Sequence, residues 1–576
     1  MKITTRIIAS ILSVLVVTAV FLPMQTQKAQ AADDYLKGNI KVTVMNKGYG
    51  VEWIYALRDA YEKKYPGCTV NLNEESVDST FMGKLTSTVN DNDIVVSTGS
   101  LFTYQYEGYL VDLTDLYKEV QEGYELSAED RMNPSFKEFY QDKDGHYYAL
   151  PWVLGFWGLC YNKTVLDATL GADSYTLPRT SGELTEICAR LAEKGVAPFI
   201  MSTQTPYWSP YMTNMYCQYM GTEAYYKFYE GYYVKDGMWT QTSNDTFEEY
   251  VDSQIGVKKS AEVVYELLTE NKFAHPQSTK IDFQISQAMF CGRDNGSGIK
   301  SAFMMNGDFM YLETMETILE THNDIRMMKY PIVSSIVETL EDKNMPETTL
   351  RNLITAIDMG ATSYAGVSAK DFQRVKQARN LVNGNGDCHV MAIPKLKNSE
   401  TKYDLSKQFL RFFLSKEGQD IYTEAQGGYI TPFNTDAKKG YSNFVDSVLS
   451  SIGDIKQFEL LSVQDYPTYY IAGLDPISGY YEGKCLSENE ANRQNPEEYF
   501  QYCKESVVIK KGQILPLITG ESATYEHVDN LLAWMFIILG IVIVLLIVFV
   551  VLTKRKEAKL NPQKADSGKK QEKSDE

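Results

Sequence analysis

Histidine is scarce in this chain, and the motifs of common hydrolases and nucleotide-binding proteins are missing. Only five His occur among 576 residues, none in an HExxH or clustered pattern, which argues against a His-ligated catalytic metal. GxSxG and Walker-type loops are also absent, and no cofactor is predicted. The eight Cys residues show neither CxxC pairs nor metal-type spacing. Several lie in apolar runs, like buried small residues, while Cys485 and Cys503 are near enough in sequence to close a local loop.

Positive charge is also in short supply. The chain has 56 Lys and Arg against 75 Asp and Glu, a formal net charge of −19. Both ends are basic, so the portion between them carries about −25. A nucleic-acid-binding surface usually needs a basic footprint. Nucleic acid is therefore excluded as an expected partner.

The N-terminal segment has the three parts of a secretory signal peptide. Lys2 and Arg6 precede an apolar stretch from residue 7 to residue 22, and Ala29 and Ala31 follow at the spacing of a cleavage site. The sequence predicts that residues 1–32 are a signal peptide, cleaved after Ala31 or Ala32. No Cys lies nearby, so the exported protein is not expected to be lipidated at its N-terminus.

A second long apolar run lies near the C-terminus. Residues 531–552 contain no charged residue, and as a helix they would extend about 33 Å, enough to cross the hydrocarbon of a bilayer. Lys554, Arg555 and Lys556 follow directly, and basic flanks favour the cytoplasmic side. We expect a single-pass cell-membrane protein with residues 33–530 extracellular. Residues 553–576 are predicted to form a short, disordered cytoplasmic tail.

The extracellular portion begins with alternating strand and helix patterns. Residues 40–45 and 93–96 are β-branched and apolar, and 68–72 is a further short strand. Between the predicted strands at 40–45 and 68–72, residues 51–65 carry apolar side chains at helical spacing. Further helical patterns occur at 181–194, 256–270 and 405–425, and a strand between lobes is predicted at 389–394. This order predicts an α/β fold with a largely parallel sheet.

Six stretches of the chain follow one another in an order typical of a known family. They are residues 42–72, 93–117, 144–168, 181–202, 301–310 and 389–434. Together they resemble the family 1 extracellular solute-binding proteins, the carbohydrate-type binding components of ABC importers. The resemblance covers about 400 residues. It departs from the pattern of relatives in single-membrane bacteria, which commonly carry a lipidated Cys after the signal peptide.

The resemblance implies a two-lobed, type II periplasmic-binding-protein-like fold, with hinge strands between two α/β lobes that close on a ligand. Lobe 1 would hold approximately residues 38–150 and 388–430, and lobe 2 residues 151–387 and 431–515. The helix at 531–552 would replace the missing lipid anchor. An additional segment at 330–388 has no role that the sequence reveals.

Sugars are bound through aromatic faces and polar side chains, so loops that follow strands are the informative places. In lobe 1 the resemblance points to Asn46, Lys47 and Tyr49 after the first strand. Ser97 and Ser100 follow residues 93–96, where relatives often place an aromatic residue and a carboxylate. This substitution weakens the expectation of conventional sugar stacking on lobe 1.

In lobe 2 the expected ligand contacts are mainly aromatic. Tyr207 and Trp208 follow an apolar segment and are the leading candidates, because an exposed aromatic pair is difficult to explain by packing. Trp152 lies where the chain first crosses between lobes, although a buried strand would explain it equally well. Asp308 and Phe309 occupy a turn that presents residues to ligand in relatives. A further candidate is Trp239.

The leading hypothesis is a membrane-tethered receptor that binds a carbohydrate, expected to be an oligosaccharide, and delivers it to an ABC permease without chemical change. One alternative is a sensor or adhesion ectodomain with the same fold. Another is a glycoside hydrolase, because acidic aromatic clefts also suit catalysis by two carboxylates. The identity of the ligand stays open at this stage.

Overall fold

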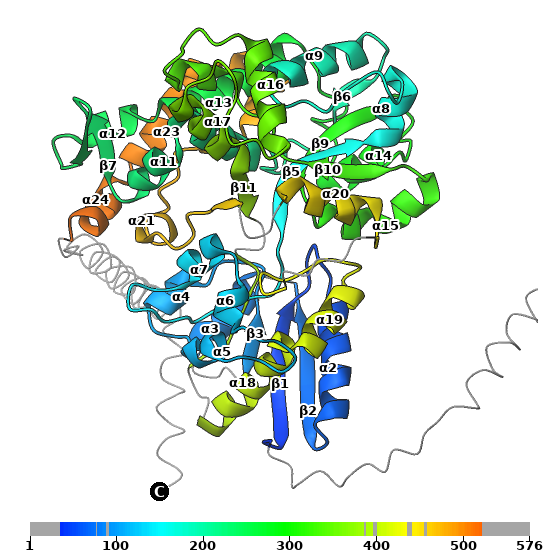
Figure 1. The fold of residues 1–576 in the computed structure, drawn as a ribbon, viewed down its shortest axis with the longest axis vertical. Coiled ribbons are helices and arrows are strands. Elements are labelled where there is room, and N and C mark those ends of the chain that lie inside the picture. The colour runs from blue at the N-terminus through cyan, green and yellow to red at the C-terminus, as the bar shows by residue number, and fades with distance from the viewer. Residues whose placement is uncertain are drawn as a thin grey trace, which may run out of the picture.

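The computed structural model describes residues 35–76, 78–87, 92–384, 388–395, 400–434, 440–453 and 458–520. The predicted signal peptide, the predicted span at 531–552 and the predicted tail lie outside these residues. No helix in the described part has both the length and the apolar character needed to cross a membrane. Two lobes, each built around its own sheet, make up the described structure (Figure 1).

Lobe 1 contains a five-stranded sheet in the order β2-β1-β3-β12-β4. β1 pairs in parallel with both β2 and β3, whereas β12 runs antiparallel to β3 and β4. The strands are β1 (Gly38–Met45), β2 (Cys68–Glu75), β3 (Ile94–Val96), β4 (Leu150–Pro151) and β12 (Val390–Ala392). The helices are α2 (Glu52–Lys64), α3 (Asp78–Thr86), α4 (Phe102–Tyr106), α5 (Thr114–Lys118), α6 (Ala128–Arg131), α7 (Pro134–Tyr140), α18 (Glu400–Leu414) and α19 (Lys416–Ala425).

Lobe 2 has a six-stranded sheet in the order β13-β11-β5-β9-β6, with β10 paired to the second half of β5. Its strands are β5 (Phe156–Asn162), β6 (Ala197–Phe199), β9 (Ser301–Gly307), β10 (Ile325–Met328), β11 (Leu381–Gly384) and β13 (Glu459–Leu461). Every side chain of β9 is buried, as expected of a central strand covered on both faces. A separate hairpin, β7 (Tyr232–Lys235) and β8 (Met238–Gln241), projects from the lobe (Figure 1).

Helices cover both faces of the lobe 2 sheet. The helices of lobe 2 include α8 (Lys163–Leu170), α9 (Ser181–Ala192), α10 (Ser209–Met220), α11 (Thr222–Tyr229), α12 (Phe247–Asp252), α13 (Ile255–Tyr265), α14 (Phe283–Phe290), α15 (Met310–Thr321) and α20 (Asn443–Ile452). α13 continues into a π-helical turn at Glu266–Glu270, so the helix predicted at 256–270 exists but changes geometry before its end.

The helix predicted at 405–425 is two helices. α18 ends at Leu414, and Ser415 caps α19, its hydroxyl accepting a hydrogen bond from the Gly418 N–H at 3.1 Å. Gly418 lies against the end of α18: a Cβ atom there would be 2.1 Å from the Phe412 carbonyl oxygen. The apolar spacing continues through this break, which is why periodicity alone joined the two helices.

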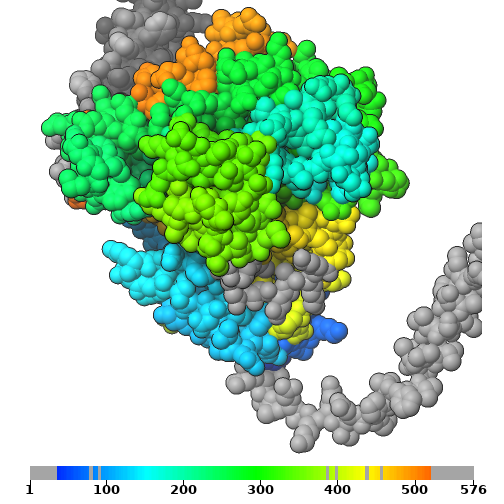
Figure 2. Space-filling model, turned by 45° about the horizontal axis from the view of Figure 1, so that its top comes forward, coloured from blue at the N-terminus to red at the C-terminus, as the bar shows by residue number. Residues whose placement is uncertain are grey.

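The segment at 330–388 forms a helical layer on lobe 2. It contains a 3₁₀ turn (Ser334–Thr339), α16 (Glu347–Asp358), α17 (Ala369–Asn380) and strand β11. The yellow-green segment forms a raised mass on one face of lobe 2 (Figure 2). The additional segment is therefore part of the lobe rather than a loop.

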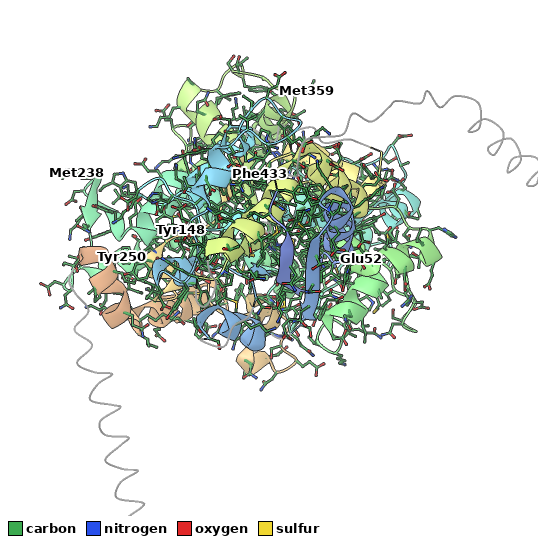
Figure 3. The ribbon with its side chains drawn as sticks, turned by 90° about the horizontal axis from the view of Figure 1, so that it is seen from below. Glu52, Tyr148, Met238, Tyr250, Met359 and Phe433 are labelled. Carbon is green, nitrogen blue, oxygen red and sulfur yellow. The ribbon has the colours of Figure 1, made fainter. Side chains whose placement is uncertain are left out.

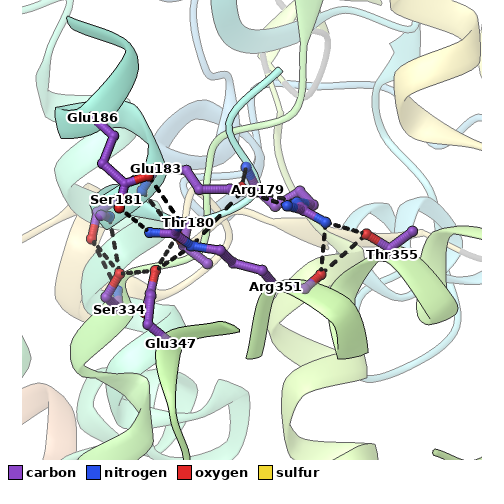
Figure 4. A network of polar contacts seen from close by, with 10 residues as sticks. Arg179, Thr180, Ser181, Glu183, Glu186, Ser334, Glu347, Arg351 and Thr355 are labelled. Carbon is purple, nitrogen blue, oxygen red and sulfur yellow. Dashed lines mark hydrogen bonds and ion pairs between the residues drawn. The ribbon is translucent and has the colours of Figure 1, made fainter. Parts of the chain in front are cut away.

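A network of charged residues fixes this layer to α9 (Figure 4). Arg179 donates two hydrogen bonds from its side chain to the Glu183 carboxylate and one to the Thr355 hydroxyl, the latter at 2.6 Å. Arg351 of α16 forms a bidentate pair with Glu186 of α9, at 2.9 and 2.7 Å. Burial alone would raise the pKa of Glu183, but the hydrogen bonds from Arg179 outweigh it and hold the pKa below its usual value.

The last described elements are α21 (Pro467–Tyr470), α22 (Tyr481–Cys485), a 3₁₀ turn (Glu490–Asn492), α23 (Pro496–Val508) and α24 (Lys511–Thr519). They pack on lobe 2, and α21 also contacts α4 of lobe 1 through the Tyr470 ring. All eight Cys lie within the described residues, none forms a disulfide there, and seven of them are buried. Cys485 and Cys503 both belong to the core of lobe 2 and are not bridged. The seven buried Cys are therefore small core residues.

Candidate functional site

Backbone hydrogen bonds join three chain segments where the lobes meet. The Trp152 N–H donates to the His389 carbonyl at 3.0 Å, and the Leu154 N–H donates to the Ile430 carbonyl at 2.7 Å. The chain between β4 and β5 is thus held beside the segments that precede β12 and follow α19. These contacts place the ends of the lobe 1 and lobe 2 sheets next to each other.

Tyr49 of lobe 1 reaches across this junction. Its side chain is 1% exposed, and its hydroxyl donates to the Asp308 carboxylate of lobe 2. The rings of Trp152, His389 and Tyr429 surround it edge-on, at centroid distances of 5.7, 5.0 and 5.8 Å. The Tyr429 hydroxyl donates to the Asp308 carbonyl at 2.7 Å. In this conformation the Asp308 carboxylate accepts a hydrogen bond from a hydroxyl group, and that hydroxyl belongs to Tyr49 of the protein itself.

Four partly exposed aromatic rings gather on the lobe 2 side of the junction: Trp157, Tyr207, Phe283 and Phe309. The centroids of Trp157 and Tyr207 lie 5.4 Å apart, those of Trp157 and Phe309 5.5 Å, and those of Tyr207 and Phe283 6.5 Å. Each pair is edge-on, at interplanar angles of 62 to 88°. We call these four residues the aromatic group. Edge-on packing leaves ring faces that do not cover one another.

Polar side chains border the aromatic group. Glu313 of α15 is exposed and accepts a hydrogen bond from the Gln287 amide of α14 at 2.8 Å. Burial, and then the nearby Glu313 carboxylate, raise the pKa of Tyr207 to about 12. The Tyr207 hydroxyl therefore stays a hydrogen-bond donor across the physiological range. Ring faces beside a carboxylate, an amide and a hydroxyl are the groups that bind a polar ligand with apolar faces.

The loop after β1 touches the aromatic group from lobe 1. A Cβ atom at Gly48 would lie 3.2 Å from the Phe309 side chain, so the two lobes are in contact here. Asn46 and Lys47 are exposed on this loop, and the Asn46 amide donates to Glu74 at 2.8 Å. The structure thus brings Asn46, Lys47 and Tyr49 to the junction beside Phe309.

Trp208 points into the core of lobe 2, unlike its neighbour Tyr207. Its side chain is 1% exposed and packs edge-on against Phe199 and Tyr211, at 5.1 and 6.3 Å, in the core of lobe 2. Successive residues of an extended loop point to opposite sides, and here Tyr207 takes the junction side. The expectation that both rings are presented to a ligand therefore differs from the structure, which buries Trp208.

Trp152 and Ser97 form one buried unit of lobe 1. Trp152 stacks on Trp53 at 4.9 Å, and its indole N–H donates to the Ser97 carbonyl at 3.0 Å. Both residues are 1% exposed. Ser100 is partly exposed, and its hydroxyl accepts from the Phe102 N–H at 3.4 Å. In this conformation Trp152 supports Tyr49 rather than offering a face of its own.

Trp239 lies on the β7–β8 hairpin, outside the junction. Its indole N–H donates to Glu223 at 3.0 Å, and 37% of the residue is exposed. The neighbouring Met238 is at the periphery of the molecule, whereas Phe433 is near its centre (Figure 3). The structure does not bring Trp239 together with the other candidates.

Sequence reasoning did not select Phe283, Gln287 or Glu313 as site residues. Phe283 and Gln287 are spaced four residues apart on α14, and Glu313 lies on α15, about 100 residues from Tyr207 in sequence. Nothing local marks these positions, because only the packing of α14 and α15 beside β9 brings them to the junction. Among the described residues, no group of three or more His, Cys, Asp or Glu could hold a metal ion.

Comparisons with known proteins agree with the two-lobed architecture. Residues 26–274 match the family model of bacterial extracellular solute-binding proteins. Among solved structures, a putative binding protein, MsmE, of Bacillus subtilis in an open conformation is similar at 13% identity, with 83% of this chain and 98% of that chain covered and a TM-score of 0.52. No curated protein sequence matches the chain.

Two further similar structures are named for their sugars. A chitin oligosaccharide binding protein shares 14% identity, covers 82% of this chain and 99% of its own, and gives a TM-score of 0.51. The solute-binding protein RafE in complex with raffinose shares 13% identity, covers 81% and 100%, and gives 0.51. At such identities these structures support the fold alone. The chain is thus similar to the bacterial extracellular solute-binding proteins over residues 26–274, and its two-lobed α/β fold is that of solved binding-protein structures.

Proposed function

We propose that this protein is a cell-surface receptor that binds a carbohydrate at the junction of its lobes and delivers it to an ABC permease. The observation that carries the proposal is the aromatic group beside Glu313 and Gln287. Sugar rings present apolar C–H faces and a rim of hydroxyls, and these side chains complement both features. The similar structures named for chitin oligosaccharides and raffinose support the same ligand class.

Lobe 2 would supply most of the stacking, and lobe 1 would complete the site on closure. Lobe 1 brings the polar loop of Asn46 and Lys47 to Phe309, whereas its Ser97 and Trp152 are buried. A ligand that contacts both lobes stabilises the closed arrangement, and the permease would engage that state. The expected ligand is an oligosaccharide, because four rings offer more stacking surface than one sugar unit needs.

The proposed setting of the receptor is the outer face of the cell membrane. The apolar run at 531–552 with basic residues after it supports an anchor whose C-terminus is cytoplasmic. An anchor keeps receptor and permease at a high effective concentration, in place of the lipid that many relatives carry.

Calorimetric titration of the full chain in detergent tests this proposal, with raffinose and chitin oligosaccharides as the first probes. We expect saturable binding without turnover, and Tyr207→Ala should weaken it about tenfold or more, because a central aromatic contact is removed. Trp239→Ala is the matched control, since it also removes an aromatic ring but lies outside the junction. Equal affinity of the Tyr207 and Trp239 variants, or release of sugar fragments, would contradict the proposal.

A further inference from the structure

An open cavity of about 870 Å³ lies on lobe 2, apart from the aromatic group. One wall of the cavity is formed by β10, which pairs with β5 on the edge opposite β9. Its other walls are the loop before α9, the C-terminal ends of α16 and α17, and one side of α20. No member of the aromatic group lines it. The additional segment at 330–388 therefore contributes two helices, α16 and α17, to a concave surface on lobe 2.

The lining is rich in positive charge, although the protein as a whole is acidic. Five cationic side chains line the cavity, against the carboxylates of Asp358 and Asp446. The five are Arg179, Arg326, Lys329, Lys376 and Arg379. The chain carries a formal net charge of −19, so this concentration of cations is unlike the molecule around it.

The three arginines are already paired. Arg326 holds Asp324 with a closest distance of 2.8 Å, Arg379 holds Asp358 at 2.8 Å, and Arg179 holds Glu183. These pairs fix the guanidinium groups and the walls that carry them, as the contacts between α9 and α16 show (Figure 4). The cavity is therefore preformed, which lowers the entropic cost of binding.

The two lysines differ from the arginines in this respect. Neither Lys329 nor Lys376 forms an ion pair with any residue in the part of the chain that the structure describes. The Lys329 ammonium donates only a long hydrogen bond, 3.3 Å, to the Arg379 carbonyl. Burial, and then the positive charge of Arg379, lower its pKa to about 8, against the opposing effect of Asp358. A partly buried ammonium that forms no ion pair with a described carboxylate is costly, and a bound anion would offset that cost.

We propose that this cavity is a second binding site, for a small oxyanion with the charge and size of sulfate or phosphate, held by Lys329 and Lys376. The arginine side chains would not need to leave their carboxylates, because the two lysines alone offer up to six N–H donors. Asn380 at the end of α17 also lines the cavity and adds an amide donor. The site is independent of the sugar-binding proposal, since the two share no residue.

Sulfate is the appropriate probe, because its charge does not change between pH 6 and pH 9. In thermal unfolding of the full chain in detergent, we expect sodium sulfate to raise the midpoint in a saturable way, beyond sodium chloride of equal ionic strength. Lys329→Met should weaken sulfate binding about tenfold or more, because a charge-assisted hydrogen bond is lost. Lys370→Met is the matched control: Lys370 lies on α17, the helix that carries Lys376, is exposed, and pairs with Glu341 outside the cavity.

Two further measurements separate a binding role from a structural one. Met matches the Lys329 side chain in length and removes an uncompensated charge, so without sulfate the variant should unfold at the same temperature as the parent or higher. Sulfate binding should also take up protons above pH 8, because the anion raises the pKa of Lys329, and the affinity should fall there. Sulfate that acts no better than chloride, or a Lys329→Met variant with unchanged sulfate affinity, would overturn the proposal.

Discussion

At the scale of single residues, the most unusual group is the carboxyl of Glu482 on α22. The residue is fully buried, and burial raises its pKa to about 8, although the backbone N–H groups of Glu482 and Trp208 oppose the rise. Because the Trp208 N–H reaches the Glu482 carboxyl, Glu482 lies next to the loop that carries Tyr207. The folded protein holds this carboxyl protonated at neutral pH, whereas the unfolded chain ionises it near pH 4.5.

We predict that this residue makes stability fall with rising pH. The folded state binds one more proton than the unfolded chain between about pH 4.5 and pH 8, so the free energy of unfolding decreases across that window and levels off above it. Glu482→Gln should flatten this dependence and raise the free energy of unfolding at pH 8, by several kcal/mol at most. Urea unfolding of parent and variant from pH 5 to pH 9 measures the effect. Parallel pH profiles would contradict this assignment of the proton.

Single residues also mark the limit of what sequence can show about the site. The aromatic pair at 207–208 indicated an important loop, and the structure does place Tyr207 at the junction. Which of the two rings faces outward depends on packing against Phe199 and Tyr211, and that information is spread over the lobe. Glu313 and Phe283 escaped notice for the same reason.

At the scale of elements, local sequence patterns predicted a strand correctly where the residue types of the segment alone determine its structure. The strands at 40–45 and 93–96 are β-branched and apolar, and the structure has β1 and β3 there. The division of the helix predicted at 405–425 depends instead on Ser415 as an N-cap and on close approach at Gly418. The layer at 330–388 could not be placed from sequence, because its position depends on ion pairs with α9.

The break between α18 and α19 gives a second prediction. Gly418→Ala should lower the free energy of unfolding by about 1–3 kcal/mol, because its Cβ would overlap the Phe412 carbonyl. Gly512→Ala on α24 is the control, since nothing lies within 4 Å of a Cβ atom there. That change should be neutral or stabilise the protein by about 0.5–1 kcal/mol. If the Gly418 variant were as stable as the Gly512 variant, the start of α19 would be able to move away from the Phe412 carbonyl without a loss of stability, and the prediction would be wrong.

At the scale of the whole molecule, the two-lobed α/β fold follows from the order of segments along the chain, and the family match agrees with it. The expected anchor lies outside the described residues and stays a prediction. Truncation after residue 530 should release the protein into the medium, whereas the full chain should stay with the membrane fraction. Immunoblots of cell fractions would decide this, and a truncated protein that remained membrane-bound would argue for another attachment.

The last described helix has a mechanical consequence. α24 is fastened to lobe 2: the Gln241 amide donates to the Ile518 carbonyl at 3.1 Å, and the Lys511 ammonium donates to the Asn244 carbonyl at 2.7 Å. An anchor reached through this helix would hold lobe 2 in place relative to the membrane, so that lobe 1 would be the lobe that moves on closure. The stacking surface would then keep one orientation above the bilayer, while the Tyr49 loop travelled to and from it with each cycle of capture and release.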